Sequence, residues 1–301
     1  MKAIVVGSNG YLGQNLTMDL LNRGVHLACY DIHDAGALEE QAHRFSYQSL
    51  DITDERAVQA VDWNADAVYF LAGLTGTRAS IEKAPSYVRT NELGLVHTLD
   101  AMARQGVHSR VFFPSTRLVY KGAPDPLKED DEKEFKTVYA LNKFCCEQLL
   151  KIYSVHYGIP YTVFRICVPY GNLGDVPFSY GTIGFLMKQA ETGTITIFGD
   201  GSQRRTFTHV GDIGEVMFRS LSNRQTKNAV YNIGGEVYSL RQAAEWIAKV
   251  RPATIRYQDW PAVDLALESG DTVFDSRKLD QLLSYRYQYR LLDWLDSLRK
   301  K

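Results

Sequence analysis

Short apolar segments rich in β-branched and aromatic residues alternate with longer amphipathic segments along the first half of this chain. Each apolar segment is followed by enough chain for a crossover helix. This rhythm is typical of a parallel sheet with helices on both faces, so we predict an α/β fold with a doubly wound sheet. The predicted strands are residues 3–6, 26–30, 67–71, 111–114 and 161–166.

The pattern changes near Val168, where glycine and proline begin to interrupt the apolar segments, as in Pro169, Tyr170 and Gly171. Such segments are typical of a lobe that covers a ligand. We predict a later strand at 230–233, a helix at 239–250 and an aromatic-rich tail that packs as a cap. The predicted larger domain spans 1–167 with a return segment at about 206–235, and the smaller lobe spans 168–205 and 236–301.

The charge balance narrows the classes of partner. The formal net charge is −1, from 34 basic and 35 acidic residues among 301. No general field therefore attracts nucleic acid or an anionic membrane, and an anionic ligand must be held by local groups. No apolar run approaches the ~20 residues of a membrane span, and the chain opens on a strand rather than a cleavable signal. We expect a soluble, cytoplasmic protein with no nucleic-acid or membrane partner.

The four cysteines are Cys29, Cys145, Cys146 and Cys167. Their spacing is not that of metal ligands, and they lie in apolar segments. This favours reduced thiols in the core over a disulfide framework or a zinc site, so we expect no metal.

Three glycines, Gly7, Gly10 and Gly13, separate the first predicted strand from an apparent helix. They let the backbone turn tightly and approach a pyrophosphate, while the helix N-terminus supplies free amide donors. The alternative is an ordinary glycine-rich turn. Asp31, at the end of the second strand, can accept hydrogen bonds from ribose hydroxyls and would repel a 2′-phosphate, which favours NAD over NADP. Alternatively, Asp31 simply opens the turn after that strand.

Tyr139 and Lys143 are four residues apart, so on a helix they share one face. A tyrosine has a pKa near 10 and is a poor base at neutral pH, but a nearby ammonium and an oxidised nicotinamide favour the phenolate. The pair would otherwise be an ordinary solvated helix face. Its position after the fourth strand, which is followed directly by Ser115 and Thr116, favours the catalytic interpretation, although strand-end hydroxyls also form turns.

The order of these features, Gly-x-x-Gly-x-x-Gly, then Thr116, then Tyr139 and Lys143, resembles the extended branch of the short-chain dehydrogenase superfamily. That branch contains nucleotide-sugar epimerases and dehydratases. The resemblance covers essentially the whole chain and implies a Rossmann-type sheet with a smaller C-terminal substrate-binding lobe. It also implies NAD as the cofactor and a homodimer formed through the helices that carry Asn91 and Tyr139.

The resemblance assigns roles to individual residues. Tyr139 is implied to be the base, Lys143 to lower its pKa and position the cofactor, and Thr116 to be the catalytic hydroxyl. Asn91 is implied to steady the loop beside the active site. The residues implied to bind the cofactor are Gly7, Asn9, Gly10, Tyr11, Leu12, Gly13, Asp31, Ile32, Asp51, Ile52, Leu71, Ala72, Gly73, Asn91, Ser115, Tyr139, Lys143 and Ile166. Those implied to bind substrate are Thr75, Thr116, Val168 and Arg205.

Two of these assignments have alternatives in the residues themselves. Asp51 follows a short strand-like stretch and resembles the residue that binds the adenine amino group, but it could equally cap a helix starting near Thr53. Arg205 matches the arginine that grips a nucleotide diphosphate, which suits the fork of a guanidinium. It could instead belong to a solvent-facing basic pair with Arg204. His209, in the same segment, is expected to be structural.

The leading functional hypothesis is an NAD-dependent nucleotide-sugar epimerase that acts at C4 of a hexose through a 4-keto intermediate. Related 4,6-dehydratases carry an acidic pair after the catalytic hydroxyl, whereas this chain has Arg117 and Leu118, so a dehydratase is not expected. One alternative is a nucleotide-linked 4-ketosugar reductase or dehydrogenase with net turnover of NAD(P)H. Another is a nucleotide-binding scaffold without catalysis.

Three departures concern the substrate pocket. Val168 stands where relatives place an asparagine that contacts the ligand, and Glu268 stands where galactose-type epimerases place an arginine. An additional residue, Lys121, separates Tyr120 from Gly122. The sequence therefore predicts a pocket that differs from the usual one for UDP-hexoses.

Overall fold

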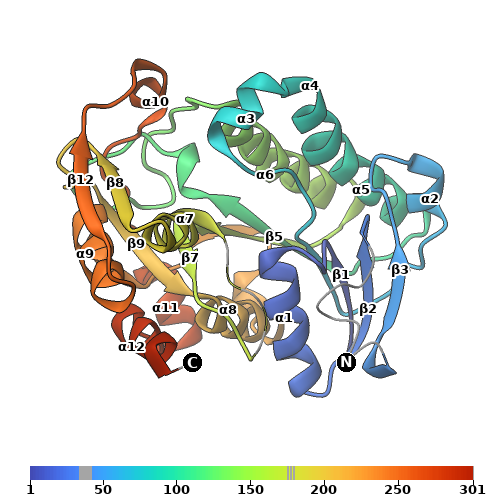
Figure 1. Cartoon of the computed structure of the whole chain (residues 1–301). Helices are drawn as coiled ribbons and strands as arrows, with labels where there is room; N and C mark the ends of the chain where they lie inside the picture. The colour runs from blue at the N-terminus through green and yellow to red at the C-terminus, as the bar shows by residue number, and fades with distance from the viewer. Residues whose placement is uncertain (34–42, 175, 177, 179, 301) are drawn as a thin grey trace.

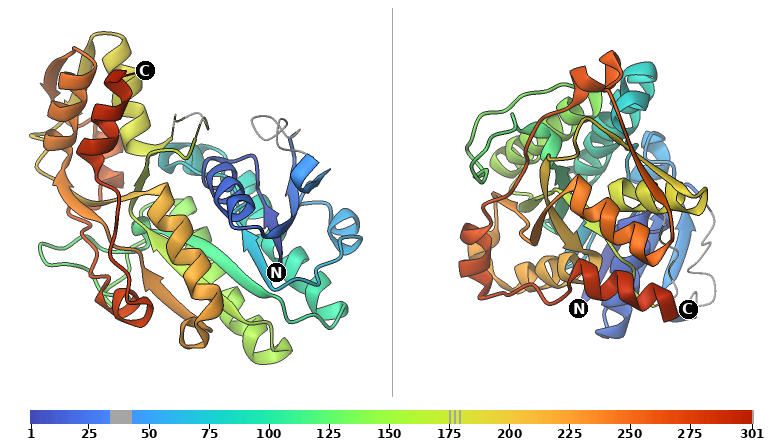
Figure 2. Two further views of the ribbon diagram at one scale, coloured as in Figure 1. Left: turned by 90° about the horizontal axis from the view of Figure 1, so that it is seen from below. Right: turned by 60° about the vertical axis from the view of Figure 1, so that its left-hand side comes forward.

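The computed structural model describes residues 1–33, 43–174, 176, 178 and 180–300. Within them, one large sheet and two small sheets are present, and helices cover both faces of the large sheet (Figure 1). The N-terminal strands lie at one end of the molecule, and the C-terminal helices gather at the other end (Figure 2). This arrangement confirms the predicted α/β class.

The large sheet has seven parallel strands in the order β10-β6-β5-β4-β1-β2-β3. Its side chains alternate between two cores: Ala3 and Val5 face one, and Ile4 and Val6 face the other. The chain order reverses at β1, so the carboxyl ends of β1 and β4 form a topological switch point, where such sheets bind ligands. The strands are β1 (Lys2–Val6), β2 (His26–Asp31), β3 (Ser46–Ser49), β4 (Ala67–Phe70), β5 (Arg110–Thr116), β6 (Tyr161–Ile166) and β10 (Ala229–Asn232).

The predicted strands all lie in this sheet, with some ends shifted. The strand predicted at 111–114 extends to Thr116, so the hydroxyl expected to be catalytic belongs to β5 itself. The strand-like stretch before Asp51 is the edge strand β3, whose polar side chains are mostly exposed. The strand predicted at 230–233 is β10, at the opposite edge.

Helices pack on each face of the large sheet through their apolar sides. One face is covered by α1 (Tyr11–Asn22), α8 (Val210–Ser222) and α11 (Arg277–Leu283), with α1 beside α8. The other face is covered by α2 (Glu55–Gln59), α5 (Gly94–Arg104) and α6 (Val138–Tyr157). The chain enters α5 through α3 (Thr77–Glu82), α4 (Ala84–Tyr87) and a π-helical stretch, η2 (Val88–Leu93).

The two small sheets build a separate core at the far end of the molecule. β9 lies between β7 and β11 in one sheet, and β8 pairs with β12 in the other. The strands are β7 (Val168–Tyr170), β8 (Thr194–Phe198), β9 (Arg204–His209), β11 (Glu236–Ser239) and β12 (Thr254–Gln258). The helices of this part are α7 (Gly181–Glu191), α9 (Leu240–Val250), α10 (Ala262–Leu267) and α12 (Leu291–Ser297). Short 3-10 turns occur at Arg117–Val119, Arg224–Thr226 and Leu298–Lys300.

The predicted helix at 239–250 is α9, and Ser239 is its N-cap in a capping box with Gln242. The domain boundaries stay a prediction, and two elements depart from the expected grouping. β9 pairs within a small sheet although most of it was assigned to the return segment, and α11 packs on the large sheet although it was assigned to the smaller lobe.

The cysteines agree with the expectation of unpaired thiols. All four cysteines are free, and three of them are buried. Across the described part of the chain, no cluster of metal-ligating side chains is present. Likewise, none of the described helices has the length and apolarity needed to cross a bilayer.

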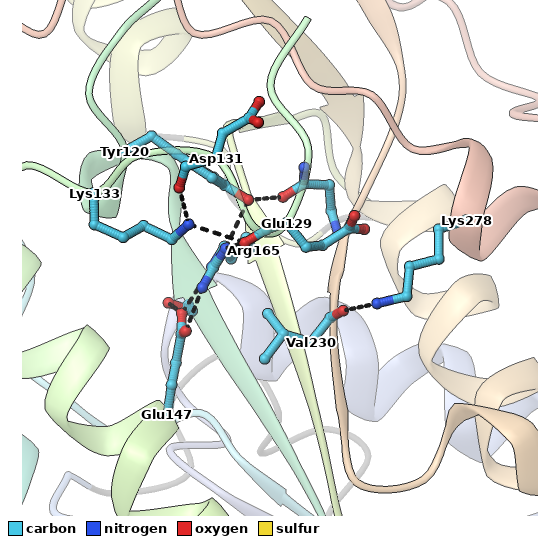
Figure 3. Close-up of polar contacts among 10 residues, drawn as sticks. Tyr120, Glu129, Asp131, Lys133, Glu147, Arg165, Val230 and Lys278 are labelled. Atoms are coloured by element: carbon cyan, nitrogen blue, oxygen red, sulfur yellow. Dashed lines mark hydrogen bonds and ion pairs between the residues drawn. The ribbon is translucent and has the colours of Figure 1, made fainter.

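A buried ion pair joins β6 to α6 (Figure 3). Arg165 on β6 donates two hydrogen bonds to Glu147 on α6, at 3.0 and 2.6 Å, and the two side chains are only 3% and 1% exposed. The remaining terminal nitrogen of Arg165 donates to the Tyr120 hydroxyl and the Glu129 carbonyl, each at 2.7 Å. Ser115 also donates to Glu147, at 2.5 Å. Glu147 therefore holds the end of β5 against the helix that carries Tyr139.

We predict that Glu147→Ala lowers the free energy of unfolding by about 3–5 kcal/mol, because it leaves the Arg165 guanidinium buried and uncompensated. Urea unfolding measures this loss. The matched control is Glu132→Ala, which removes a solvent-exposed ion pair with Lys121 and is expected to change stability by no more than about 0.5 kcal/mol. Equal effects of the two substitutions would contradict this account.

Candidate active site

The turn between β1 and α1 requires glycine because backbone segments approach each other closely there. A Cβ on Gly7, whose φ is +85°, would lie 2.4 Å from the Ala72 amide nitrogen. A Cβ on Gly13 would lie 2.0 Å from the Gly7 carbonyl oxygen. Gly10 is the N-cap of α1 and offers no side-chain cap. The first amides of this helix are therefore available to an anionic ligand such as a pyrophosphate.

Asp31 closes the adjacent edge of the site. Its carboxylate accepts hydrogen bonds from the Asn9 amide at 2.9 Å and the His33 amide at 3.1 Å, so it links the glycine turn to the end of β2. Asp51 accepts a hydrogen bond from the Thr53 amide at 2.8 Å. The N-cap of α2 is Asp54, so the alternative that Asp51 caps a helix near Thr53 is wrong.

Two cavities share the glycine turn. The first, of about 650 Å³, extends from this turn past β2 and the 50–53 segment to α4 and η2. Ten of the residues predicted to bind cofactor line it: Gly7, Asn9, Gly10, Asp31, Ile32, Asp51, Ile52, Leu71, Ala72 and Gly73.

The second cavity, of about 310 Å³, extends from the same turn to the end of β5 and the start of α7. Its lining includes the catalytic candidates and most of the remaining predicted residues, which are Tyr11, Leu12, Gly13, Thr75, Ser115, Thr116, Tyr139, Lys143, Ile166 and Val168. The first cavity suits an adenosine and the second suits a nicotinamide together with a small reacting group.

Tyr139 and Lys143 lie in the first two turns of α6. Thr137 begins that helix, and its hydroxyl accepts a hydrogen bond from the Ala140 amide at 3.0 Å. The Lys143 ammonium donates to the Pro114 carbonyl at 2.9 Å and lies 4.4 Å from the centre of the Phe113 ring. Both side chains therefore point from α6 toward the carboxyl end of β5.

The electrostatics of the pair define its resting state. Burial raises the pKa of Tyr139 well above that of a free tyrosine, the nearby Tyr180 raises it further, and a hydrogen bond with Thr116 opposes the increase. Burial lowers the pKa of Lys143 to about 8. The phenol is therefore protonated at rest, and an additional positive charge in the cavity is needed to make it a base near neutral pH.

Comparison with known proteins identifies the family. The family model described as "NAD dependent epimerase/dehydratase family" matches residues 3–234. The chain belongs to this family. Its members depend on NAD by that description, and the two joined cavities fit such a cofactor, because the glycine turn leaves room and free amides for a pyrophosphate between them.

Relatives of known name cover most of the chain. A putative UDP-glucose 4-epimerase of Methanocaldococcus jannaschii is 27% identical over 77% of this chain and 76% of its own. A UDP-glucuronate 4-epimerase of Thermodesulfobacterium geofontis is 28% identical over 89% of this chain and 87% of its own. A solved UDP-glucuronic acid 4-epimerase from Bacillus cereus, in complex with UDP-glucuronic acid and NAD, has a TM-score of 0.84 and 26% identity, covering 100% of this chain and 98% of that chain.

Asn91 holds the segment that follows β4 through two hydrogen bonds to Leu74. Its side-chain oxygen accepts a hydrogen bond from the Leu74 amide at 2.7 Å, and its nitrogen donates to the Leu74 carbonyl at 3.0 Å. It lies in η2, where a π-helical turn marks many functional sites. Asn91 is absent from the described lining of both cavities, so its contact is with the loop, as the family resemblance implies.

Ser115 differs from Thr116 in its environment. Ser115 lines the second cavity, but its hydroxyl donates a hydrogen bond to Glu147 behind the cavity wall. The Thr116 hydroxyl faces Tyr139 and also accepts a hydrogen bond from the Leu118 amide at 3.3 Å. Thr116 is thus the hydroxyl that can exchange a proton with Tyr139.

The structure corrects the prediction for Arg205. Its side chain is buried, and its guanidinium donates to Glu268 at 2.5 Å, to the Arg204 carbonyl at 2.9 Å and to the Gly270 carbonyl. Among the described residues that line the two cavities, Arg205 does not occur. Groups of the protein already accept the hydrogen bonds of this guanidinium, so Arg205 is not placed to bind a diphosphate as expected. Because the side chain is buried, the solvent-facing alternative is wrong as well.

His209 ends the same strand. Its Nδ1 accepts a hydrogen bond from the Gly211 amide at 3.0 Å as the N-cap of α8, and its ring stacks on Tyr289. Burial lowers the pKa of His209 to about 4, so the neutral ring is favoured. These contacts fit the structural role expected from the sequence.

Sequence reasoning overlooked part of the second cavity. Arg117, Tyr180 and Thr182 line it without having been assigned to the site. No sequence pattern marks Tyr180 as a site residue. It reaches the cavity from the loop before α7 and stacks on Tyr11. Arg117 directly follows Thr116 in the sequence, which places it near the site. The sequence analysis used it only to show that the acidic pair of the dehydratases is absent.

We predict that Gly13→Ala weakens NAD binding and lowers the free energy of unfolding by about 1–3 kcal/mol, because its Cβ would overlap the Gly7 carbonyl. NAD titration and urea unfolding measure the two effects. The control is Gly214→Ala in α8, where the nearest atom is a side-chain oxygen of Asp19 at 3.2 Å rather than a backbone atom at 2.0 Å. The control is expected to retain both properties, and equal NAD affinity in the two variants would count against the glycine turn as the cofactor site.

Proposed function

We propose that this chain is an NAD-dependent nucleotide-sugar epimerase that acts at C4 of a hexose unit. One observation carries the proposal: Thr116, Tyr139 and Lys143 line a single cavity next to the glycine turn. The names of the relatives support the choice of reaction, because both the glucose and the glucuronate enzymes among them are 4-epimerases. The absence of an acidic pair at Arg117 and Leu118 supports epimerisation over dehydration.

Bound NAD supplies the acceptor and later the donor of the hydride. Tyr139 takes the proton of the sugar hydroxyl, directly or through Thr116, and returns it after the keto sugar has turned over in the cavity. Lys143 adds positive charge on the same wall and so favours the phenolate. Desolvation alone would keep Tyr139 protonated, so the base functions only when cations share the cavity with it.

We predict that Tyr139→Phe lowers kcat by about 10²- to 10⁴-fold, because the proton acceptor is lost while the cavity keeps its shape. The assay follows product stereochemistry with a panel of sugar nucleotides. The control is Tyr153→Phe on the same helix, whose hydroxyl bonds to Asp100 outside the site. Turnover in the Tyr139 variant close to that of the unmodified enzyme would refute the assignment.

The same panel separates the alternative functions. An epimerase interconverts two sugar nucleotides without net consumption of cofactor, whereas stoichiometric consumption of added NADH or NADPH would indicate a ketosugar reductase. NAD binding with no turnover of any sugar nucleotide would indicate a scaffold.

A cytoplasmic homodimer is part of this proposal. Leu141, Ile152 and Val155 lie on one side of α6, since their spacing is close to whole numbers of helical turns, and all three are exposed. Val88 and Leu93 of the neighbouring η2 are also exposed. These apolar side chains support an interface through the helices that carry Tyr139 and Asn91.

We predict a solution mass of twice that of the chain, measured by light scattering during size-exclusion chromatography. Ile152→Asp combined with Val155→Asp is expected to shift the protein to monomer, because charges would then face each other across the interface. Phe185→Asp on α7, also exposed but far from α6 in the chain, is the control. A monomeric unmodified protein would exclude this interface.

A further inference from the structure

The second cavity contains an arginine that the proposed chemistry does not use. Arg117 immediately follows Thr116 and starts the short turn Arg117–Val119 at the end of β5. It lines the cavity together with Thr116, Tyr139 and Lys143. Lys143 has a place in the proposed reaction beside Tyr139, whereas Arg117 is a cation of this group that the reaction leaves unused.

Behind this wall, Arg117 lies near a second arginine, Arg205, and near the carboxylate of Glu268, which pairs with Arg205. Glu268 Oε1 accepts hydrogen bonds from Arg205 at 2.5 Å and from the Gly270 amide at 2.9 Å. Among the described residues, the one hydrogen bond of the Arg117 guanidinium is to the Thr272 hydroxyl, at a long 3.5 Å, and it has no ion pair. Counting Arg117, Arg205 and Glu268, the cluster carries one excess positive charge.

That excess charge is energetically unfavourable until an anion arrives. Burial lowers the pKa of Arg117 to about 10, and repulsion from Arg205 contributes to the decrease. A partly desolvated guanidinium without a carboxylate costs free energy, which an anionic ligand in the same cavity would offset. The cavity is therefore electrostatically suited to a substrate that brings its own negative charge.

The position of Arg117 in the cavity indicates which part of the substrate carries the negative charge. The Cα atoms of adjacent residues are about 3.8 Å apart, so Arg117 begins next to the hydroxyl that faces the reacting carbon. A group on a neighbouring ring carbon lies within its reach, whereas the diphosphate is attached across the ring from C4. A carboxylate also matches the planar fork of a guanidinium, which can bind it through two hydrogen bonds.

We propose that Arg117 binds a carboxylate on the sugar carbon next to the reacting carbon, so that the enzyme prefers nucleotide-linked hexuronic acids to neutral hexoses. This inference rests on the proposed function and narrows its substrate class. Arg117 acts here as a residue that determines specificity. Arg205, by contrast, has its charge balanced by Glu268 and supports the cluster from behind.

Binding to an inert holoenzyme tests this without relying on turnover. The Tyr139→Phe variant loaded with NAD is titrated with UDP-glucuronate and with UDP-glucose. We expect UDP-glucuronate to bind at least about 100-fold more tightly, as one buried charge-assisted pair allows. Adding Arg117→Met is expected to reduce this ratio to near one, mainly by weakening UDP-glucuronate, while Arg117→Lys keeps part of it.

A control variant and a measurement of folding accompany this titration. Arg204→Met removes a guanidinium that pairs with Asp271 at the exposed start of β9, and it is expected to leave the ratio unchanged. Arg117→Met is expected to fold with an equal or higher melting temperature, because it removes an unpaired charge and one long hydrogen bond. If this variant does not fold, Arg117→Lys still tests the ratio.

The outcomes separate this inference from the proposed function. Equal loss of both ligands in Arg117→Met would assign Arg117 to the diphosphate, and an unchanged ratio would make it structural. Either result overturns the carboxylate proposal, as does equal binding of the two sugars to the starting holoenzyme. Failure of both nucleotides to bind at all would count against the proposed function itself.

Discussion

Close packing of backbone against backbone at the first turn is the constraint on which the rest of the site depends. Gly7 lies against the segment after β4, and Gly13 lies against the Gly7 carbonyl, so that β1, α1 and β4 meet with no room for side chains. The switch point of the sheet is therefore open at its carboxyl edge and closed beneath it. Both cavities start from this turn, which therefore sets how the cavity beside β2 is placed relative to the one lined by Thr116, Tyr139 and Lys143.

The catalytic end depends on a second layer of contacts. Arg165, Glu147 and Ser115 join β6, α6 and β5 in a buried network, while Lys143 reaches from α6 to the Pro114 carbonyl. The helix that carries Tyr139 and the strand that ends in Thr116 are thus attached to each other at two points. Such support is needed because proton transfer tolerates only small errors in distance.

Local patterns made much of this predictable. The glycine spacing, the Tyr139/Lys143 pair and the helix at 239–250 each involve a few neighbouring residues and one kind of element, so sequence alone could place them. The predicted strands entered one parallel sheet for the same reason. Most residues assigned to the cofactor lie along its two cavities.

Non-local contacts were beyond such patterns. Glu268 was noticed as a departure from relatives, but its pairing with Arg205 spans 63 positions and depends on where the 268–272 segment crosses β9. Tyr180 reaches the second cavity from the start of α7, far along the chain from the glycine turn and the end of β5. The sequence places Arg117 next to Thr116. That the Arg117 guanidinium has no ion pair among the described residues could be recognised only once the neighbours of its side chain were known.

The ion pair between Arg205 and Glu268 has a consequence for how this scaffold can change over evolutionary time. An arginine committed to an internal carboxylate keeps β9 packed whichever ligand occupies the cavity. The charge that meets the ligand is carried instead by one side chain on a short turn, outside the hydrogen-bonded strands. Ligand preference can therefore drift by single substitutions at that turn while the fold and the proton-transfer machinery stay under separate selection.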